Sequence, residues 1–479
     1  MNRRIFFKQF GCISLLSLNF SGLSRAKENK SEKPDIVLFV ADDMTWRDCE
    51  PYGSTVVKTP NMAKLAREGM CFDAMFTSTA MCAPTRQQLY TGLYPVRSGA
   101  WPNHSRVYDG VKSLAHHLKS LGYRVGLKGK RHYGPEASFP FEYFGGRHHD
   151  NGAGLDLDIR KVESFIQRDP TQPYCLIVAT NQPHSPWNRT IESVSYDPDA
   201  IQVPPYLVDT PETRRLLCQY YHEITYADQQ LGQCMEVVER LGRPDKTIVV
   251  FTSEQGSDFP FGGKWTCYDT GLKTAFIVRW PGKVIPNTRN AAMTQYVDVA
   301  PTLIEAAGGD PSNFDPGRPD ALGSTGFDGR SFMQVLQGKT QRFRNYVYGV
   351  QTSRGIHNGP EAYPIRSVRS ERYKYIWNPN WQVRFTNMAT RGEPISSWRK
   401  RAEADEDIAA RVRFYQHRPE EELYDLQNDP WELNNLAADD KRTSVKAQLR
   451  EQLLAWMKQQ GDEGMATEMQ ALSRFRDNL

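Results

Sequence analysis

The sequence lacks the features that would place it in several large classes of protein. It has no run of about 18 or more apolar residues, which argues against a membrane-spanning helix. No two cysteines have the CxxC spacing of zinc knuckles and redox motifs, and there are no internal repeats or low-complexity tracts. With 39% hydrophobic and 24% charged residues among 479, the composition is that of a folded globular chain. This length suggests two or three domains.

A basic excess is also missing once the N-terminal segment is set aside. The net charge of +4 is accounted for by Arg3, Arg4, Lys8 and Arg25, because residues 1–26 contain no Asp or Glu. A nucleic-acid-binding protein should carry a positive excess. The rest of the chain carries none, so nucleic acid is not an expected partner.

Residues 1–26 have the composition of an export signal. A basic start is followed by mostly apolar residues from Leu15 to Phe20, and residues 23–26 end in a small-residue cleavage site at Ala26. The Arg3-Arg4 pair shortly before the apolar stretch is similar to that of twin-arginine signals. A buried first helix is the alternative. We expect an exported protein, either periplasmic or extracellular.

Export would permit disulfides, but the cysteine spacing assigns none. Cys12 lies in the expected signal, which leaves Cys49, Cys71, Cys82, Cys175, Cys218, Cys234 and Cys267. Because this number is odd, at least one of these thiols has no disulfide partner. Cys82 is the candidate.

Four segments predict the buried strands of a mostly parallel sheet. Each is a short apolar run bounded by polar residues or glycine, at residues 35–41, 123–127, 174–180 and 247–253. Helical patterns separate them. The clearest runs from Leu217 to Leu241, with apolar residues alternately three and four apart. Strands that alternate with helices predict an α/β fold in which helices cover both faces of the sheet.

The pattern changes near residue 340. Residues 308–338 are rich in Pro and Gly, and residues 391–413 are charged and read as loop or helix. Residues 445–460 read as a closing amphipathic helix. Three segments read as strands of a smaller antiparallel sheet: residues 345–350, 369–377 and 422–426. We therefore expect a main domain over residues 33–340 and a C-terminal α+β subdomain over residues 341–479.

Residues that can carry chemistry stand at the carboxyl ends of the four predicted strands. In open α/β sheets, ligands bind beyond these ends. The strands are followed in order by Asp42-Asp43, by Lys128-Gly129-Lys130-Arg131-His132, by Asn181-Gln182-Pro183-His184 and by Glu254-Gln255. One such group would be an ordinary polar loop. Four together indicate a site where these strand ends meet.

The segment Cys82-Ala83-Pro84-Thr85-Arg86 predicts a nucleophile at the start of a helix. Pro84 suits the first helical position, and the helix would stop at Gly92, so that Cys82 lies just before its N-terminus. Backbone N–H groups and the helix dipole favour an anion there, and Arg86 adds a positive fork one turn on. The alternative is a buried structural cysteine.

Together these motifs resemble those of the type I sulfatase family. Cys82-x-Pro84-x-Arg86, followed by Leu89-Tyr90-Thr91-Gly92, is similar to the family signature. Further similar landmarks follow in the family's order: Asp42-Asp43, residues 129–134, residues 297–303 and residues 422–430. The resemblance covers nearly the whole chain after the signal. It implies the alkaline-phosphatase-like superfold, with residues 33–340 as the catalytic domain.

The resemblance implies that a maturation enzyme oxidises Cys82 to formylglycine, an aldehyde. Its hydrate carries two hydroxyls on one carbon. One attacks sulfur and forms a covalent sulfate ester, and the other then loses a proton so that sulfate leaves by C–O cleavage. Dividing the reaction in this way avoids slow hydrolysis of an ordinary serine ester.

Further family roles map onto residues at the other strand ends. Lys130 and Arg86 would hold the oxygens of the hydrate and the sulfate. His132 would take the proton of the second hydroxyl, while His184 and Lys264 would contact the sulfate and help protonate the leaving group. Taken singly, each histidine is equally compatible with an ordinary hydrogen-bonding position in a loop.

The residue types also predict a calcium site. Asp42, Asp43, Glu254 and the amide oxygen of Gln255 are hard ligands that suit Ca²⁺ better than zinc, which prefers His and Cys. An oxygen of the modified Cys82 would complete the shell. Either acidic pair alone reads equally as a solvated turn. The family usually has Asp followed by Asn or His where this chain has Glu254-Gln255, which puts the metal affinity in question.

The substrate is less well indicated. Residues 129–136 and 139–143 resemble the heparan N-sulfatase (sulfamidase) branch, but bacterial enzymes of this appearance include O-sulfatases of algal polysaccharides. No residue separates N–S from O–S cleavage. Trp101, His104 and Arg106 follow the signature and are candidates for lining the sugar pocket, or they belong to a structural loop. His148-His149 match no motif and are expected to be structural.

We therefore expect a hydrolase that releases sulfate from a sulfated oligo- or polysaccharide, with one Ca²⁺ per chain. Two alternatives stay open. One is a phosphonate or phosphate-ester hydrolase of the same superfold, and the other is an unmatured glycan-binding protein without activity.

Overall fold

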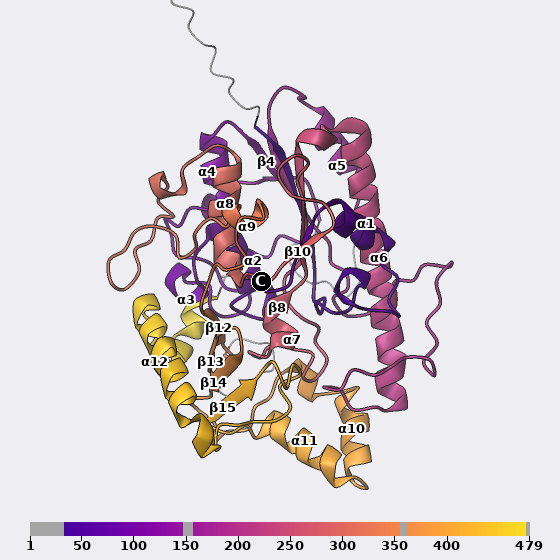
Figure 1. Ribbon diagram of the computed structural model, residues 1–479, viewed down its shortest axis with the longest axis vertical. Coiled ribbons are helices and arrows are strands. Elements are labelled where there is room, and N and C mark those ends of the chain that lie inside the picture. Colours follow the sequence, from indigo (N-terminus) through magenta and orange to yellow (C-terminus); the bar gives the residue numbers. More distant parts are fainter. Residues whose placement is uncertain (1–32, 147–156, 355–361, 476–479) are drawn as a thin grey trace, which may run out of the picture. The chain divides into compact units, whose positions relative to one another are not determined.

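The four apolar runs form neighbouring strands of one sheet in the computed structural model, which describes residues 33–146, 157–354 and 362–475 (Figure 1). Across the sheet they are ordered β7 (Thr247–Ser253), β1 (Asp35–Ala41), β6 (Tyr174–Ala179) and β4 (Arg124–Gly129). All pairings among them are parallel. The expected signal peptide and His148-His149 lie outside the described residues.

Shorter strands extend this sheet at both edges. Beyond β4 lies β5 (Glu142–Tyr143), and beyond β7 lie β9 (Phe276–Arg279), β2 (Met70–Phe72) and β10 (Thr288–Asn290). Among the described pairings of this large sheet, only those of β9 with β7 and with β2 are antiparallel. The expectation of a mostly parallel sheet is therefore confirmed. A small separate sheet contains β11 (Thr294–Gln295), β3 (Met75–Phe76) and β8 (Lys273–Thr274).

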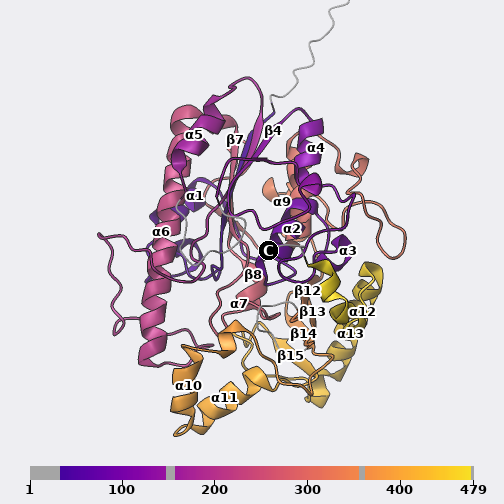
Figure 2. The same cartoon turned by 180° about the vertical axis from the view of Figure 1, so that it is seen from behind.

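Alternate residues of β1 point into two different hydrophobic cores. Val37 and Phe39 share one core with three helices: α1 (Pro60–Glu68), α5 (Ile159–Gln167) and α6 (Pro211–Leu241). Ile36 and Leu38 share the other with α2 (Cys82–Thr91), α4 (Leu114–Ser120) and α8 (Val299–Ala306). Figures 1 and 2 show these two groups of helices on opposite faces of the sheet. The strands are apolar throughout because both faces are covered.

The long helix α6 starts earlier than its apolar pattern predicts. It begins at Pro211 rather than at Leu217, and it ends at Leu241 as expected. The Thr210 side chain caps it by accepting a hydrogen bond from the Thr213 N–H at 3.1 Å. The first turns are polar, so the apolar spacing gave no signal for them.

The C-terminal region forms the expected antiparallel sheet, but one strand boundary is wrong. Its strands are β12 (Val347–Gln351), β13 (Ile365–Arg369), β14 (Tyr373–Trp377) and β15 (Glu421–Asp425). Residues 369–377 are not one strand, because the chain reverses after Arg369. The Ser370 N–H donates to the Tyr373 carbonyl at 2.8 Å and closes this turn.

Helices complete the C-terminal region. The charged segment 391–413 is largely helical, with α10 (Ile395–Ala402) and α11 (Glu406–Gln416), and α12 (Thr443–Gln460) packs on the sheet. The Val350 N–H donates to the Ser78 carbonyl at 2.7 Å, which joins β12 to the segment before α2. The described residues belong to one compact unit that starts at Lys33. The boundary near residue 340 stays a prediction.

The described cysteines are all free and buried. No disulfide therefore links any two of them within the described ranges. Nor does any helix within those ranges combine the length and the apolar character that crossing a membrane requires.

Candidate active site

Two parallel strands bring four polar residues together. Asp42 and Asp43 follow β1, and Glu254-Gln255 follow β7. Because Ala41 pairs with Ser253 in parallel register, both pairs leave the sheet at the same point. All four side chains are buried. Gln255 Nε2 lies 2.6 Å from Asp43 Oδ1 and 3.0 Å from Glu254 Oε1.

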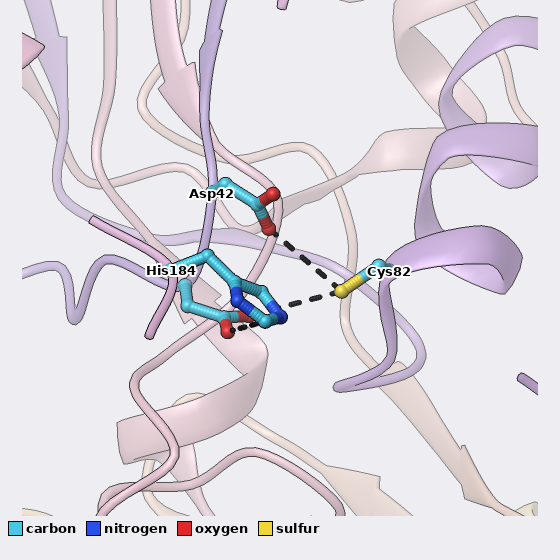
Figure 3. Close-up of side chains that lie close together, drawn as sticks. Asp42, Cys82 and His184 are labelled. Atoms are coloured by element: carbon cyan, nitrogen blue, oxygen red, sulfur yellow. Dashed lines mark hydrogen bonds and ion pairs between the residues drawn. The ribbon is translucent and has the colours of Figure 1, made fainter. Parts of the chain in front are cut away.

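Cys82 lies at the same point, at the N-terminus of α2. The helix begins at Cys82 itself, so the expectation that Cys82 precedes the helix is wrong. Pro84 still falls in the first turn, where an N–H has no partner within the helix. Gly92 ends the helix with φ 68°, as expected. The Cys82 sulfur is 3.7 Å from Asp42 Oδ1 and 3.9 Å from Asp43 Oδ1 (Figure 3).

Three buried cations face the three acids. Lys130 Nζ lies 2.5 Å from Asp42 Oδ2, and Lys264 Nζ lies 2.5 Å from Asp43 Oδ2. Arg86 Nε lies 2.5 Å from Glu254 Oε2. These six residues and Cys82 are named the charge cluster below. Its three positive and three negative side chains cancel formally, so a bound divalent cation would make it positive and suited to an anion.

The three acids of the charge cluster differ in the direction in which their pKa values are shifted. Burial alone would raise the pKa of Asp42, but Lys130 leads the groups that lower it to about 2. Burial raises the pKa of Asp43 despite Lys264, and it raises that of Glu254 to about 8 despite Arg86. Carboxylates this close disfavour each other's charge in a water-poor site. A divalent cation would relieve that repulsion.

The Cys82 thiol is held in its protonated form. Burial is the main cause that raises its pKa well above the usual value, and the nearby Glu254 adds to it. The thiolate is the nucleophilic form of cysteine. Cys82 is therefore poorly suited to react as a thiol at neutral pH.

His184 borders the charge cluster from the loop after β6. Its Nε2 lies 3.4 Å from Asp43 Oδ2 and 3.1 Å from Lys264 Nζ. Its Nδ1 lies 2.6 Å from the Ser185 carbonyl, which can only accept, so this nitrogen carries the proton. The His184 side chain is 14% exposed, whereas Lys264 is 3% exposed. In Figure 3 the side chains of His184 and Asp42 both point toward the Cys82 sulfur.

The donor set fits a divalent cation. Potential ligand atoms of Asp42, Asp43, Cys82 and His184 all lie within 4.8 Å of one another. Gln255 Oε1 is buried and has no hydrogen-bond partner among the described residues. A half-turn of this amide would exchange Oε1 with Nε2 and present the oxygen to Asp43 and Cys82. Each of the three expected carboxylate ligands also binds a buried cation: Asp42 binds Lys130, Asp43 binds Lys264 and Glu254 binds Arg86.

His132 lies beside His104. Its Nε2 is 2.9 Å from His104 Nδ1. Trp101 is 2% exposed and packs in a core with Tyr94 and Val297, and Arg106 is exposed. The sugar-binding roles suggested for Trp101, His104 and Arg106 stay predictions.

Sequence reasoning missed Asn103. Its Oδ1 accepts from the Ala83 N–H, one residue from Cys82, at 3.3 Å, and its Nδ2 lies 3.2 Å from His104 Nε2. No motif in the sequence includes this asparagine. Its only signal was its place next to His104.

Comparison with known proteins agrees with this arrangement. Residues 34–309 match the sulfatase family, and residues 258–383 and 404–459 match the C-terminal region of N-sulphoglucosamine sulphohydrolase. An ulvan-active sulfatase of Formosa agariphila is 32% identical over 468 residues, which are 94% of this chain and 88% of that protein. The N-sulphoglucosamine sulphohydrolase of Homo sapiens is 28% identical over 500 residues, which are 93% and 92% of the two chains.

A solved structure shows the same fold. BT4656, in complex with its substrate D-glucosamine-2-N,6-O-disulfate, superposes with a TM-score of 0.68 at 19% identity, covering 91% of this chain and 99% of that one. The large α/β sheet with a smaller antiparallel sheet is thus the alkaline-phosphatase-like fold of sulfatases. The family match and the full-length relatives together establish that the chain belongs to the sulfatase family, near its sulfamidase branch, as a hydrolase of sulfate esters or sulfamates.

Proposed function

We propose that this protein is an exported, calcium-dependent sulfatase that releases sulfate from a sulfated oligo- or polysaccharide. Its nucleophile would be formylglycine, made from Cys82 by a separate maturation enzyme. The main support is the convergence of Asp42, Asp43, Cys82 and His184, whose ligand atoms lie within 4.8 Å of one another. The names of the relatives, ulvan-active sulfatase and N-sulphoglucosamine sulphohydrolase, favour a sulfated sugar.

Residue 82 would act as an oxygen nucleophile rather than a sulfur one. Its thiol is held protonated by burial, as its raised pKa indicates. As a hydrated aldehyde it would carry two hydroxyls on one carbon, one to take the sulfuryl group and one whose deprotonation releases sulfate. The N-terminus of α2 would favour the negative charge of this residue and its substrate.

Asp42, Asp43, Glu254 and Gln255 would hold the Ca²⁺. Their oxygens are ligands of the type that calcium prefers, whereas the nitrogen of His184 is not. When bound, the ion would supply positive charge that orients the nucleophilic oxygen and offsets the charge of the sulfate. The orphaned Gln255 Oε1 supports this assignment, because a buried amide oxygen without a partner costs free energy.

The cations of the charge cluster have distinct tasks. Arg86 and Lys130 are fully buried and held by Glu254 and Asp42, so they would neutralise oxygens at residue 82 with little reorganisation. His184 and Lys264 lie 3.1 Å apart, and His184 is partly exposed. That pair would face the substrate and protonate the leaving group. By the family resemblance, His132 would take the proton of the second hydroxyl.

Mass spectrometry of the peptide that contains Cys82 tests this proposal. From the native host, or after co-expression with a maturation enzyme, we expect the aldehyde, and we expect sulfate release to scale with its fraction. A Cys82→Ser variant, shown to be unconverted, should lose turnover or trap sulfate. Wild-type turnover by that variant would refute the mechanism.

Three measurements separate the alternatives. Faster turnover of an aryl phosphate than of an aryl sulfate would favour the phosphate-ester hydrolase. An unmodified thiol from the native host, together with glycan binding, would favour the inactive binding protein. Sulfate release from N-sulphoglucosamine and from ulvan oligosaccharides would then decide between sulfamate and sulfate-ester cleavage.

A further inference from the structure

A cavity of about 360 Å³ lies between α3 (Pro95–Ser98), the loop at residues 318–321, the end of α12 and α13 (Met465–Met469). No member of the charge cluster lines it. Figures 1 and 2 show α3 beside α12 in both views. Sites for small molecules typically enclose about 300–1,000 Å³. This cavity is therefore a second possible binding site, separate from the charge cluster.

Two buried residues that line the cavity each have a polar atom without a partner. Trp101 and Gln460 are 2% and 4% exposed, and Trp101 Nε1 and Gln460 Oε1 form no hydrogen bond with any described residue. The orientation of the Gln460 amide is fixed, because its Nε2 lies 3.2 Å from Asp328 Oδ1, a carboxylate oxygen that only accepts. A buried polar atom without a partner costs free energy, which a bound ligand can recover.

Hydroxyl groups fit both of these atoms. A hydroxyl can accept from the indole N–H of Trp101, and it can also donate to the amide oxygen of Gln460. A carboxylate could serve only the first atom, and an ammonium could serve only the second. The buried part of the cavity therefore suits a ligand with several hydroxyls, such as a sugar.

The mouth of the cavity is positively charged. Arg318 is exposed, lines the cavity and stacks on Tyr108, with its Cζ 4.2 Å from the ring centroid. Arg474 stacks on the same ring at 4.0 Å, and neither arginine forms an ion pair within the described ranges. Asp320, which also lines the cavity, instead accepts from two backbone N–H groups of its own loop at 2.8 and 2.9 Å. Such a mouth suits an anionic group.

Exposed apolar side chains stand next to the lining residues in the chain. Leu322 follows the lining residue Ala321, and Met469 and Leu472 flank the lining residue Gln470. These three side chains are 64%, 52% and 53% exposed in that order. Apolar groups that stay exposed beside polar ones are typical of interaction sites.

The loop that carries Trp101 is fixed to helix α2. Gln87 Nε2 donates to the Ser105 carbonyl at 3.1 Å, and Gln87 Oε1 accepts from the Val107 N–H at 3.1 Å. The helix that begins at Cys82 therefore supports one wall of the cavity. A ligand in the cavity is held by the same rigid part of the protein that carries residue 82.

We propose that this cavity is an accessory site that binds one acidic sugar unit of the polysaccharide, with hydroxyls at Trp101 and Gln460 and a carboxylate or sulfate group at Arg318. That the ligand belongs to the substrate chain rests on the proposed function. The accessory site performs no chemistry itself. It holds the polymer on the enzyme by a second contact, which raises the apparent affinity for a chain that reaches both sites.

The indole N–H of Trp101 gives a direct readout of binding. The full-length enzyme is labelled with ¹⁵N-tryptophan, and the Trp101 signal is assigned as the one lost in Trp101→Phe. The probe is glucuronate, which has hydroxyls and a carboxylate but no sulfate to release, and glucose is the neutral control. We expect glucuronate to shift the Trp101 signal. Arg318→Gln should weaken glucuronate binding about tenfold, because it removes a charged hydrogen bond, and should leave glucose binding unchanged.

Three results would overturn the proposal. The Trp101 signal could stay in place with glucuronate and with ulvan oligosaccharides, which would mean that the cavity holds only water. Arg318→Gln could leave glucuronate binding unchanged, or glucose could bind as tightly as glucuronate. These measurements need no turnover. An inactive enzyme with the expected shift would therefore contradict the proposed function and leave the sugar site intact.

A matched pair of variants tests the role of the site on a polymer. Ala321 is exposed at the mouth, so Ala321→Trp should fill the cavity and abolish the glucuronate shift. Ala447 is exposed on α12 and does not line the cavity, so Ala447→Trp is the control. We expect Ala321→Trp to raise KM for the sulfated polysaccharide about tenfold, with kcat and aryl sulfate turnover unchanged. Ala447→Trp should change none of these.

Two outcomes of this comparison would contradict the accessory role. An unchanged polysaccharide KM in Ala321→Trp, with the glucuronate shift abolished, would mean that the polymer does not use the cavity. An equal loss of aryl sulfate and polysaccharide turnover in Ala321→Trp would mean that the cavity supports the catalytic structure instead of binding the polymer.

Discussion

Two of the protein's buried groups of ionisable side chains are built differently. One is the charge cluster beside β1 and β7. The other lies at the C-terminal sheet and contains the pairs Arg366–Asp462, Lys374–Asp269, Lys374–Glu432 and Arg418–Glu422. Side chains in both are withdrawn from water, so burial and charge alone do not separate a functional group from a structural one.

The pairs of the C-terminal sheet are closed. Arg366 binds both oxygens of Asp462, with Nη2 at 2.9 Å from Oδ1, and its Nη1 donates to the Gln351 carbonyl at 3.0 Å. Glu422 accepts from Tyr268 at 2.9 Å and from Tyr424 at 2.7 Å on one oxygen, while Arg418 binds the other at 3.0 Å. The acceptor oxygens of these pairs are occupied, which leaves them little capacity for a ligand.

The charge cluster is open by comparison. Carboxylate oxygens of Asp42 and Asp43 and the sulfur of Cys82 face one point, and Gln255 Oε1 has no partner among the described residues. Burial raises the pKa of Asp43 and of Glu254, and the Asp42 carboxylate adds to both; the pKa of Glu432 beside Asp269 is raised in the same way, so these shifts do not separate the two groups. The comparison indicates that converging donors of one sign, rather than buried ion pairs, identify the site.

The largest expected effect is on turnover. Asp42→Asn keeps the size of the side chain but removes a negative charge from the point where donors converge. We expect aryl sulfate turnover to fall at least about 1,000-fold, since both the cation site and the partner of Lys130 are lost. Asp462→Asn, the same change in a closed pair, should keep turnover per folded molecule within about twofold. A similar loss of turnover in both variants would mean that the charge cluster and the pairs of the C-terminal sheet do not differ in function.

Stability should show the reverse order. Asp462→Asn leaves Arg366 buried and without its charged partner, which costs about 3–5 kcal/mol in free energy of unfolding. Asp42→Asn also removes the nearest carboxylate of Lys130, but it should cost less without calcium, because Glu254 Oε1 lies 3.9 Å from Lys130 and the repulsion of Asp42 with Asp43 and Glu254 is relieved. Urea unfolding of both variants in chelator measures this difference. A greater loss for Asp42→Asn would mean that the charge cluster holds the fold together more than it binds ions.

Calcium should distinguish the two regions in the intact protein. An ion that binds only the folded chain stabilises it by about 4 kcal/mol at 1,000 times its Kd. We expect calcium to raise the melting temperature of the wild type and of Asp462→Asn but not of Asp42→Asn. Thermal unfolding with calcium or chelator tests this, with magnesium and zinc as controls for ion identity. Equal stabilisation of all three proteins would place the ion elsewhere.

Much of the open region could be predicted from sequence, because it follows from short patterns. Apolar runs predicted the strands β1 and β7. Because these strands pair in parallel, Asp42-Asp43 and Glu254-Gln255 follow them at the same edge of the sheet. The start of α2 was placed too late because Pro84 is tolerated anywhere in the first turn.

The pairs of the C-terminal sheet and the contact of His104 with His132 could not be predicted in this way. Arg366 and Asp462 are far apart in sequence, and no periodicity links them. The contact of His104 with His132 depends on two residues in left-handed conformations, which are uncommon for residues with side chains. Local propensity therefore gave no reason to expect either conformation. Contacts that form only in the folded tertiary structure produce no periodic pattern in the sequence.

Glu254 shares one feature with each of the two groups. Its substitution has the smallest expected effect, and the result distinguishes a metal ligand from a structural partner of Arg86. Glu254 Oε2 is paired with Arg86 at 2.5 Å, as in a closed pair, while its Oε1 lies 3.0 Å from Gln255 Nε2, inside the open cluster. Glu254→Asp withdraws the carboxylate by about 1.5 Å, one carbon–carbon bond. If Glu254 binds the ion, calcium affinity should fall about tenfold, because the remaining ligands are set for the longer arm.

Glu422→Asp is the matched control, because it shortens a carboxylate of a closed pair by the same bond. It should lower the melting temperature and leave the calcium Kd unchanged, as titration calorimetry would measure. If Glu254→Asp behaves in the same way, then Glu254 serves Arg86 alone. The ion would then depend on Asp42, Asp43 and Gln255, and Glu254, where the family resemblance implies Asp, would be a structural replacement rather than a change in the metal site.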